Sequence, residues 1–259
     1  MAAILYEVRD HIAFITINRP EVMNALNRDA WEGLAHAWER VRDDPEVLSA
    51  IVTGAGNKAF SAGADLKEMA RLDAETGQGE ATSRIWSDAL VGMEVWKPFI
   101  AAVNGYCLAG GMELSLLCDF RIAAEHATFA VTEVTIGGIP GTGGTQRLTR
   151  LIPFTHALEL LMVGDRIDAQ EAYRLGLVSK VVPQTDLMST AEALARRLNR
   201  NAPLSVRAVK EAAYKGSQMT LEQGLRLEAM LLGQLQHTQD NREGPRAFVE
   251  KRPPVFKGR

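Results

Sequence analysis

Two glutamates, Glu113 and Glu133, have side chains that could transfer protons, and both lie among apolar residues. Three leucines follow the first, and three β-branched residues surround the second: Leu114, Leu116 and Leu117, and Val131, Val134 and Ile136. A carboxyl group in apolar surroundings has its pKa biased upward, which suits a general acid. Each glutamate alone also has an ordinary explanation, since Glu113 fits the first turn of a surface helix and Glu133 fits the edge of a strand.

Two glycine-bearing turns could supply backbone N–H groups to the same chemistry. Residues 60–67 (FSAGADLK) form one, and residues 105–111 (GYCLAGG) lead from an apolar strand into a helix. The first N–H groups of a helix have no partner within it and lie at the positive end of its dipole. Two such turns facing one another would stabilise an oxygen that becomes negative. Either turn alone is explained by the backbone freedom of glycine.

Other chemistries find weaker support. The segment 52–60 (VTGAGNKAF) contains G-x-G-x-x-A, but a loop follows where a dinucleotide-binding motif would open a helix. Cys107 could be presented as a nucleophile after a strand, yet the histidines are scattered and never stand at triad-like spacing. A free cysteine is more often a small buried hydrophobe. The same scatter of histidines gives no metal-binding motif, so we expect neither a metal nor a redox cofactor.

Composition narrows the classes of partner. The 259 residues carry a net charge of −3, which offers no basic surface to nucleic acid. The most apolar stretch, 99–118, is interrupted by Asn104, three glycines and Glu113, so we expect no membrane span. Two cysteines cannot form a disulfide framework, and the amino terminus has no signal-peptide pattern. We therefore expect a cytoplasmic protein.

Strands and helices must position the two glutamates and the two turns. The pattern predicts a hairpin at 3–8 and 11–17, a helix at 28–42 capped by Asn27, and a mobile loop at 73–80. The remaining strands are expected at 48–53, 99–103, 120–124, 128–131 and 177–182, and the remaining helices at 81–96, 111–117, 143–163 (broken at Pro153) and 168–175. This alternation indicates an α/β fold with parallel strand pairing.

The chain is expected to be only helical after about residue 185. We therefore predict an α/β core with the active site at 1–200 and a helical subdomain at 201–259. The apolar residues of this subdomain exceed what a lone helix can hide, and they could cover the core or a neighbouring subunit: Leu221, Leu225, Met230, Leu231 and Leu235.

Three segments taken together resemble the enoyl-CoA hydratase/isomerase (crotonase) family: residues 60–67, residues 97–114, and Glu133 with residues 138–148. The resemblance extends over the whole chain to the closing residues 243–256, and it is most specific in these middle segments. It implies a crotonase-type spiral of ββα turns with a carboxyl-terminal helical region that assembles trimers, often paired into hexamers.

The resemblance also implies roles for individual residues. Ala64 and Gly110 match the two oxyanion-hole amides of the family, and Glu113 and Glu133 match the two catalytic glutamates of its true hydratases. Five further positions match substrate-binding segments, the first three along the CoA thioester and the last two by their backbone near the CoA adenine: Asp65, Leu66 and Lys67, and Ala25 and Ala62.

The implied activity is reversible addition of water to a 2-enoyl-CoA, giving a 3-hydroxyacyl-CoA, in β-oxidation or a related acyl-CoA degradation. CoA is then part of the substrate, Glu113 is the ionised base and Glu133 is the acid. Three alternatives stay open: a 3-enoyl-CoA isomerase that needs only Glu133, a specialised acyl-CoA dehydratase, and a non-catalytic acyl-CoA-binding protein. The chain departs from many members at Ala109, where they have Gly, and at Thr132, where they have Pro.

Overall fold

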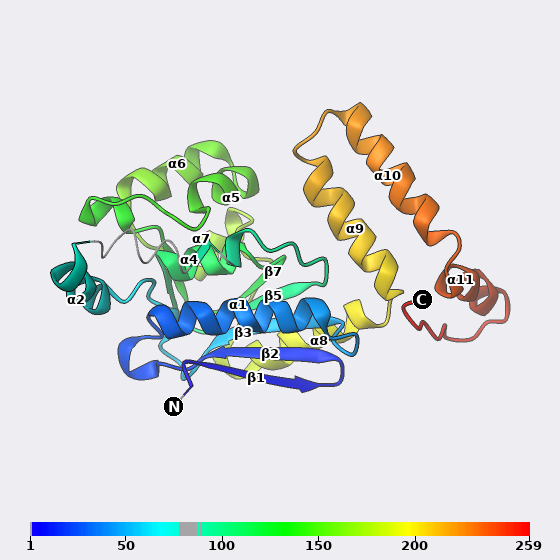
Figure 1. The fold of residues 1–259 in the computed structure, drawn as a ribbon, viewed down its shortest axis with the longest axis horizontal. Coiled ribbons are helices and arrows are strands. Elements are labelled where there is room, and N and C mark those ends of the chain that lie inside the picture. Colours follow the sequence, from blue (N-terminus) through cyan, green and yellow to red (C-terminus); the bar gives the residue numbers. More distant parts are fainter. Residues whose placement is uncertain (1, 78–86, 89) are drawn as a thin grey trace.

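Two β-sheets form the centre of the protein (Figure 1). The computed structural model describes residues 2–77, 87–88 and 90–259. The larger sheet has six strands in the order β1 (Ile4–Arg9), β2 (Ile12–Ile17), β3 (Ser49–Gly54), β5 (Phe99–Val103), β7 (Phe120–Ala124) and β10 (Lys180–Val182). The smaller sheet has four strands in the order β4 (Ala59–Ser61), β6 (Tyr106–Leu108), β8 (Thr128–Ala130) and β9 (Ile167–Asp168).

The pairing confirms the predicted hairpin and the predicted parallel sheet. β1 and β2 are antiparallel and are joined through Asp10 and His11, whose φ angles of 50° and 63° suit a two-residue hairpin turn. β2, β3, β5, β7 and β10 pair in parallel. In the smaller sheet β4, β6 and β8 are parallel, and β9 is antiparallel to β8.

The chain repeats one unit as it passes between the sheets. In each unit one strand joins the larger sheet, the next joins the smaller sheet, and a helix follows. The repeats are β3–β4 with α2 (Leu66–Thr76), β5–β6 with α4 (Gly110–Leu116), and β7–β8 with α5 (Gly144–Leu151), which follows a short 3₁₀ helix. This repetition is the expected spiral of ββα turns.

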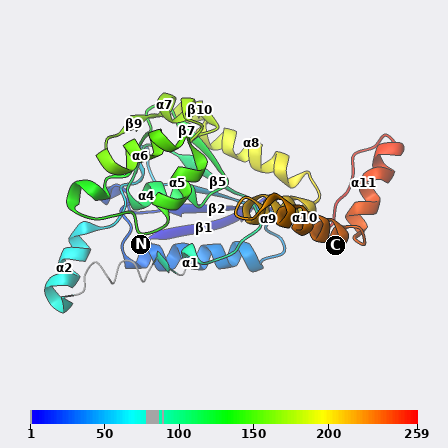
Figure 2. The same cartoon turned by 90° about the horizontal axis from the view of Figure 1, so that it is seen from above.

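Helices cover opposite faces of the larger sheet (Figure 2). α1 (Arg28–Asp43) begins at Asn27, whose Oδ1 accepts a 3.0 Å hydrogen bond from Ala30 N as predicted. It packs in the same apolar cluster as Ala13 and Ile15 of β2. α8 (Leu187–Asn199) packs in the cluster that contains the alternate β2 residues Ile12 and Phe14. The two faces of the strand are thus buried against different helices, because successive side chains point to opposite faces.

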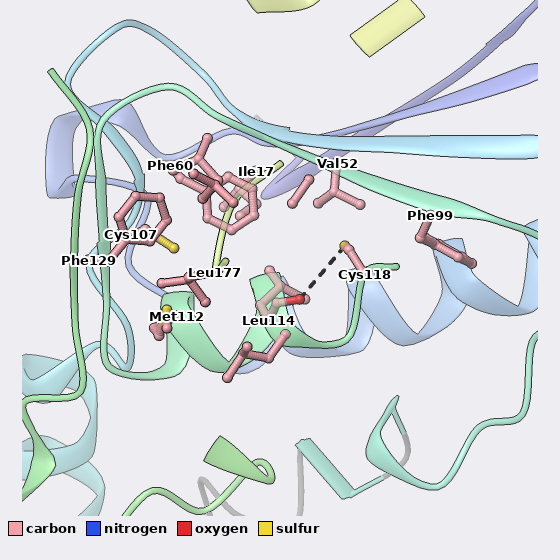
Figure 3. Packing of buried hydrophobic residues seen from close by; sticks show 14 of the residues in the cluster. Ile17, Val52, Phe60, Phe99, Cys107, Met112, Leu114, Cys118, Phe129 and Leu177 are labelled. Atoms are coloured by element: carbon pink, nitrogen blue, oxygen red, sulfur yellow. Dashed lines mark hydrogen bonds between the residues drawn. The ribbon is translucent and has the colours of Figure 1, made fainter. Parts of the chain in front are cut away.

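The short helix α4 lies inside the core. Figure 3 shows Met112 and Leu114 among the buried residues Phe60, Cys107 and Phe129, and all five belong to one apolar cluster. Since both neighbours of Glu113 are anchored in this cluster, the backbone at the glutamate is held in place by core packing.

Three local predictions need correction. Residues 73–76, expected in a loop, end α2, which stops at Gly77 in the left-handed conformation, and residues 78–80 lie outside the described residues. The helix expected at 81–96 falls partly outside them, and residues 93–96 are not helical. The last helical residue of this segment is Val91 and Gly92 lies in a turn, so the helix ends before Pro98, which disfavours helix at Lys97 as well. Residues 106–108, expected in a tight turn, form β6.

The remaining helices follow the prediction more closely. α5 and α6 (Phe154–Val163) are separated at Pro153, and α7 (Ala169–Arg174) follows. The short 3₁₀ helices are η1 (Pro20–Val22), η2 (Glu133–Ile136) and η3 (Gln184–Asp186). Within the ranges that the structure describes, no helix is long and apolar enough to cross a membrane.

The last helices project from the core (Figure 1): α9 (Pro203–Gly216), α10 (Leu221–Leu235) and α11 (Gln239–Val249). α9 is tied to the core where Lys210 Nζ contacts Asp119 Oδ2 at 2.8 Å. The expected excess of apolar surface is present on α10, where Leu221 is 80% exposed and Leu225 and Met230 are each 54% exposed.

Candidate active site

The predicted site residues follow neighbouring strands of the smaller sheet. Ala64 comes after β4, Gly110 after β6 and Glu133 after β8. Because β4, β6 and β8 are parallel, their carboxyl ends lie at one edge of the sheet. Ligands of α/β proteins commonly bind at such an edge.

The two glycine-bearing turns are in direct contact at this edge. A Cβ on Gly63 would lie 2.8 Å from Ala109 Cβ and 3.0 Å from Gly110 N, and Gly63 has a φ of +88°. Only glycine fits this position. A Cβ on Gly110 would lie 3.7 Å from Ala64 N. The structure therefore brings the backbone of Ala64 close to that of Gly110.

The N–H group of Ala64 is left free by its neighbours. Leu26 N donates to Gly63 O at 2.7 Å, and Asp65 N donates to Leu26 O at 3.1 Å, so both flanking groups face Leu26. Successive backbone groups of an extended chain point in opposite directions, which turns the N–H of Ala64 away from Leu26. Among the described residues this N–H donates no hydrogen bond.

Gly110 is the first residue of α4, so its N–H has no acceptor within the helix. In the described part of the chain it has no other backbone acceptor either. The preceding residue, Ala109, has φ 49° and ψ −124°, a conformation that glycine adopts more readily. It is held there by a 2.9 Å hydrogen bond from its N–H to Ala130 O. The departure from glycine at this position therefore leaves the turn intact, with some backbone strain.

Glu113 is 3% exposed and is bound by a loop. Its Oε1 accepts hydrogen bonds from Thr142 N at 2.7 Å and from Gly144 N at 2.8 Å. Burial raises the pKa of Glu113, while these two bonds and the charge of Arg147 act in the opposite direction. The sequence placed Glu113 in the first turn of a helix, and it gave no sign that residues 142–144 would bind this carboxylate.

Glu133 differs from Glu113 in its partners. It begins η2 and does not lie on the edge of a strand. Its Oε2 is buried without a hydrogen-bond partner among the described residues. Burial, together with the nearby charge of Glu113, raises the pKa of Glu133 to about 7. The predicted apolar flanks are not the whole cause, because Val134 and Ile136 are 42% and 65% exposed.

Asp65 has two structural partners. Its Oδ1 caps α2 by accepting a 3.3 Å hydrogen bond from Glu68 N, and its Oδ2 pairs with Arg19 Nη2 at 2.9 Å. The same guanidinium donates through Nη1 to Ala25 O at 2.6 Å. Arg19, which sequence reasoning missed, therefore joins the segment of Ala25 to the loop of Asp65.

The other predicted substrate-binding residues lie along the same loop. Leu66 and Lys67 begin α2, where both are exposed and Leu66 is 53% exposed. Ala62 is half-buried, and its N–H donates to Met23 O at 3.0 Å. These positions belong to the first glycine-bearing turn and to the start of α2. Among the described residues, their side chains form no hydrogen bond or ion pair with Glu113 or Glu133.

The two cysteines are poorly suited to nucleophilic catalysis. Cys107 and Cys118 are fully buried free thiols, and burial raises the pKa of each to about 12. A thiolate would therefore be rare at neutral pH. Within the described ranges, no group of three or more His, Cys, Asp or Glu residues could hold a metal ion.

Known proteins are similar to this chain in sequence and in fold. The model of the family described as enoyl-CoA hydratase/isomerase matches residues 7–259. The (E)-benzylidenesuccinyl-CoA hydratase of Thauera aromatica is 43% identical, covering 97% of this chain and 98% of its own. The crotonyl-CoA hydratase of Syntrophomonas wolfei is 44% identical, covering 98% and 97%. The crystal structure of an enoyl-CoA hydratase from Bacillus anthracis is 42% identical, covers 99% and 100%, and superposes with a TM-score of 0.92. The chain therefore belongs to the enoyl-CoA hydratase/isomerase family.

Proposed function

We propose that this protein is an enoyl-CoA hydratase, which reversibly adds water to a 2-enoyl-CoA thioester and gives a 3-hydroxyacyl-CoA. One observation carries the proposal: Glu113 accepts two backbone hydrogen bonds one helical turn from Gly110, whose N–H, like that of the adjacent Ala64, has no backbone acceptor among the described residues. Glu133, whose Oε2 is buried without a partner in the described part of the chain, follows the neighbouring strand β8. The relatives named as hydratases over nearly the full chain support the same reaction.

The thioester is activated by its carbonyl oxygen. Conjugation makes the β-carbon electrophilic, and negative charge moves to the thioester oxygen as water adds. In our proposal the N–H groups of Ala64 and Gly110 donate hydrogen bonds to this oxygen. Donors of this kind are worth about 3–4 kcal/mol each where they have been measured in other enzymes.

The glutamates transfer the protons. Glu113, bound by two N–H groups, has the stabilised carboxylate and accepts a proton from water as the oxygen attacks the β-carbon. Glu133, with its pKa of about 7, holds a proton near neutral pH and delivers it to the α-carbon. The product gains OH at the β-carbon and H at the α-carbon, and the proton gained by Glu113 replaces the one lost by Glu133.

The remaining groups are assigned to binding. We propose that residues 65–67 line the CoA thioester and that the backbones of Ala25 and Ala62 face the CoA adenine. The reaction needs no redox change and no metal, so we propose that no further cofactor takes part. The two buried free thiols fit a reducing compartment, and we propose the cytoplasm.

We further propose that residues 201–259 form a subdomain that assembles a trimer, or a hexamer made of two trimers. The exposed apolar residues of α10 support this, because apolar patches of soluble proteins commonly mark protein contacts. Sedimentation velocity at micromolar concentration should show a trimer or hexamer. A clean monomer would contradict the assembly.

The proposed activity can be tested with a panel of enoyl-CoA thioesters. Hydration removes the conjugated double bond, so the absorbance of the enoyl thioester should fall, and a 3-hydroxyacyl-CoA should appear by mass spectrometry. The Glu113→Gln variant is the control for contaminating hydratase. No loss of conjugation with any member of the panel would contradict the proposal.

A further inference from the structure

Arg147 of α5 contacts the loop that binds Glu113. Its Nη1 donates a 2.9 Å hydrogen bond to Thr142 O, and the N–H of the same threonine binds Glu113 at 2.7 Å. A Cβ on Gly143 would overlap Arg147 Nη1, so the guanidinium lies directly against this turn. One side chain therefore contacts the segment that supplies both N–H groups to the carboxylate.

The turn depends on this contact for its shape. Gly143 has a φ of +95°, and its carbonyl accepts from Gln146 N at 3.1 Å and from Arg147 N at 2.9 Å, which fixes one end of the turn. Thr142 is 5% exposed, so its carbonyl has little access to water if the guanidinium is removed. An unpaired buried carbonyl is unfavourable, and the turn would rearrange to expose it.

We infer that Arg147 is a positioning residue for the hydration reaction, because its guanidinium holds residues 142–144 in the shape that directs two N–H groups at Glu113. The inference rests on the proposed function. It assigns to Arg147 no contact with the substrate, only the placement of the base.

The charge of Arg147 adds a second effect. Among the described residues, the charge of Arg147 from α5 acts on Glu113, Glu113 acts on Glu133 of η2, and Tyr214 of α9 acts on Arg147. The positive charge of Arg147 and the two N–H bonds lower the pKa of Glu113 against the effect of burial. Loss of Arg147 removes the charge and loosens the bonds, so the pKa of Glu113 rises and less of it is ionised at neutral pH.

Three variants test the inference: Arg147→Met, Arg147→Lys and the matched control Arg150→Met. Arg150 lies on the same helix but is exposed, and within the described ranges its Nη1 donates hydrogen bonds to Gln146 alone, at 2.8 and 3.0 Å. Arg147→Met should lower kcat by about 10- to 100-fold with KM within about threefold, as expected for a misplaced catalytic group. Arg147→Lys should recover part of the loss, and Arg150→Met should match the wild type. The acidic limb of the pH profile of kcat should move to higher pH in Arg147→Met and move less in Arg147→Lys. It should stay unchanged in Arg150→Met.

A titration without substrate separates this inference from the proposed function. In protein labelled with ¹³C at the glutamate carboxyl carbons, the Glu113 signal is identified by its absence in Glu113→Gln. Its titration midpoint should rise in Arg147→Met and stay unchanged in Arg150→Met. If Arg147→Met does not fold, Arg147→Lys should show a smaller rise. An unchanged midpoint in the folded variant overturns the inference whatever the rate, whereas failure of the wild type to hydrate any thioester overturns the proposed function alone.

Discussion

Replacing Glu133 by Gln should stabilise the protein at high pH, although it removes a proposed catalytic group. Above pH 7 the native Glu133 is charged while its Oε2 is buried without a partner. Burial, with a contribution from the charge of Glu113, raises its pKa from 4.5 to about 7. At about 1.4 kcal/mol per pKa unit, this shift corresponds to roughly 3 kcal/mol as an upper limit, since Glu133 is only partly buried.

The sign of the effect follows from the direction of the shift. A carboxyl group whose folded pKa is raised binds its proton more tightly in the folded state. Its effect on stability is therefore absent below pH 4.5, grows unfavourable as the pH rises toward about 7, and is constant above that. Glutamine has no charge and avoids this loss.

The assay is thermal unfolding of wild type and Glu133→Gln between pH 4.5 and pH 8 at one protein concentration. The variant should have a Tm higher by up to about 5–10 °C at pH 8, with a difference near zero at pH 4.5. Glu125→Gln, at an exposed glutamate, is the control and should show no such pH-dependent gain. A Tm difference that is the same at both pH values would refute the burial argument for Glu133.

Three further predictions concern the turns and the chemistry. Gly63→Ala should lower hydration at least about a hundredfold with the fold retained in circular dichroism, because its Cβ would clash with Ala109 and displace the Ala64 N–H; near wild-type turnover would contradict the oxyanion site. Ala109→Gly should raise Tm by relieving a strain of about 1 kcal/mol, with kcat within a few-fold; a lower Tm would show that the strain is absent. Dialysis against a chelator should leave full activity, and activity restored only by added metal would refute the metal-free mechanism.

Much of the larger sheet and the major helices could be predicted from local pattern. The Asn27 cap of α1 and the break at Pro153 depend on neighbouring residues, so they are visible in the sequence. β6 was missed because a strand of three residues, Tyr106–Leu108, is too short to show alternation. The end of α2 was also missed. The glycine-rich composition of residues 73–80 suggested a loop from residue 73, but the helix continues to Thr76 and ends at Gly77.

The candidate catalytic residues of the site could be predicted from the sequence, but the contacts that surround them could not. Glu113, Glu133 and the two turns stand out by residue type and by the resemblance to a family. Their surroundings come from contacts between distant segments, such as Thr142 N with the Glu113 carboxylate and Arg19 with Asp65. The raised pKa of Glu133 likewise reflects burial of one oxygen atom, which the exposed side chains beside it in the sequence do not reveal.

Single-turnover hydration by Glu113→Gln, Glu133→Gln and the double variant tests the two-glutamate mechanism most directly. Glutamine keeps the size and most of the hydrogen bonding of glutamate but cannot exchange the proton. Each single variant should lower the rate at least about a hundredfold with CoA-thioester affinity within a few-fold, and the losses should not multiply in the double variant. An isomerase would depend mainly on Glu133, and a binding protein would show no turnover in the wild type. A Glu113→Gln enzyme that still hydrates a 2-enoyl-CoA at near wild-type rate would contradict the mechanism.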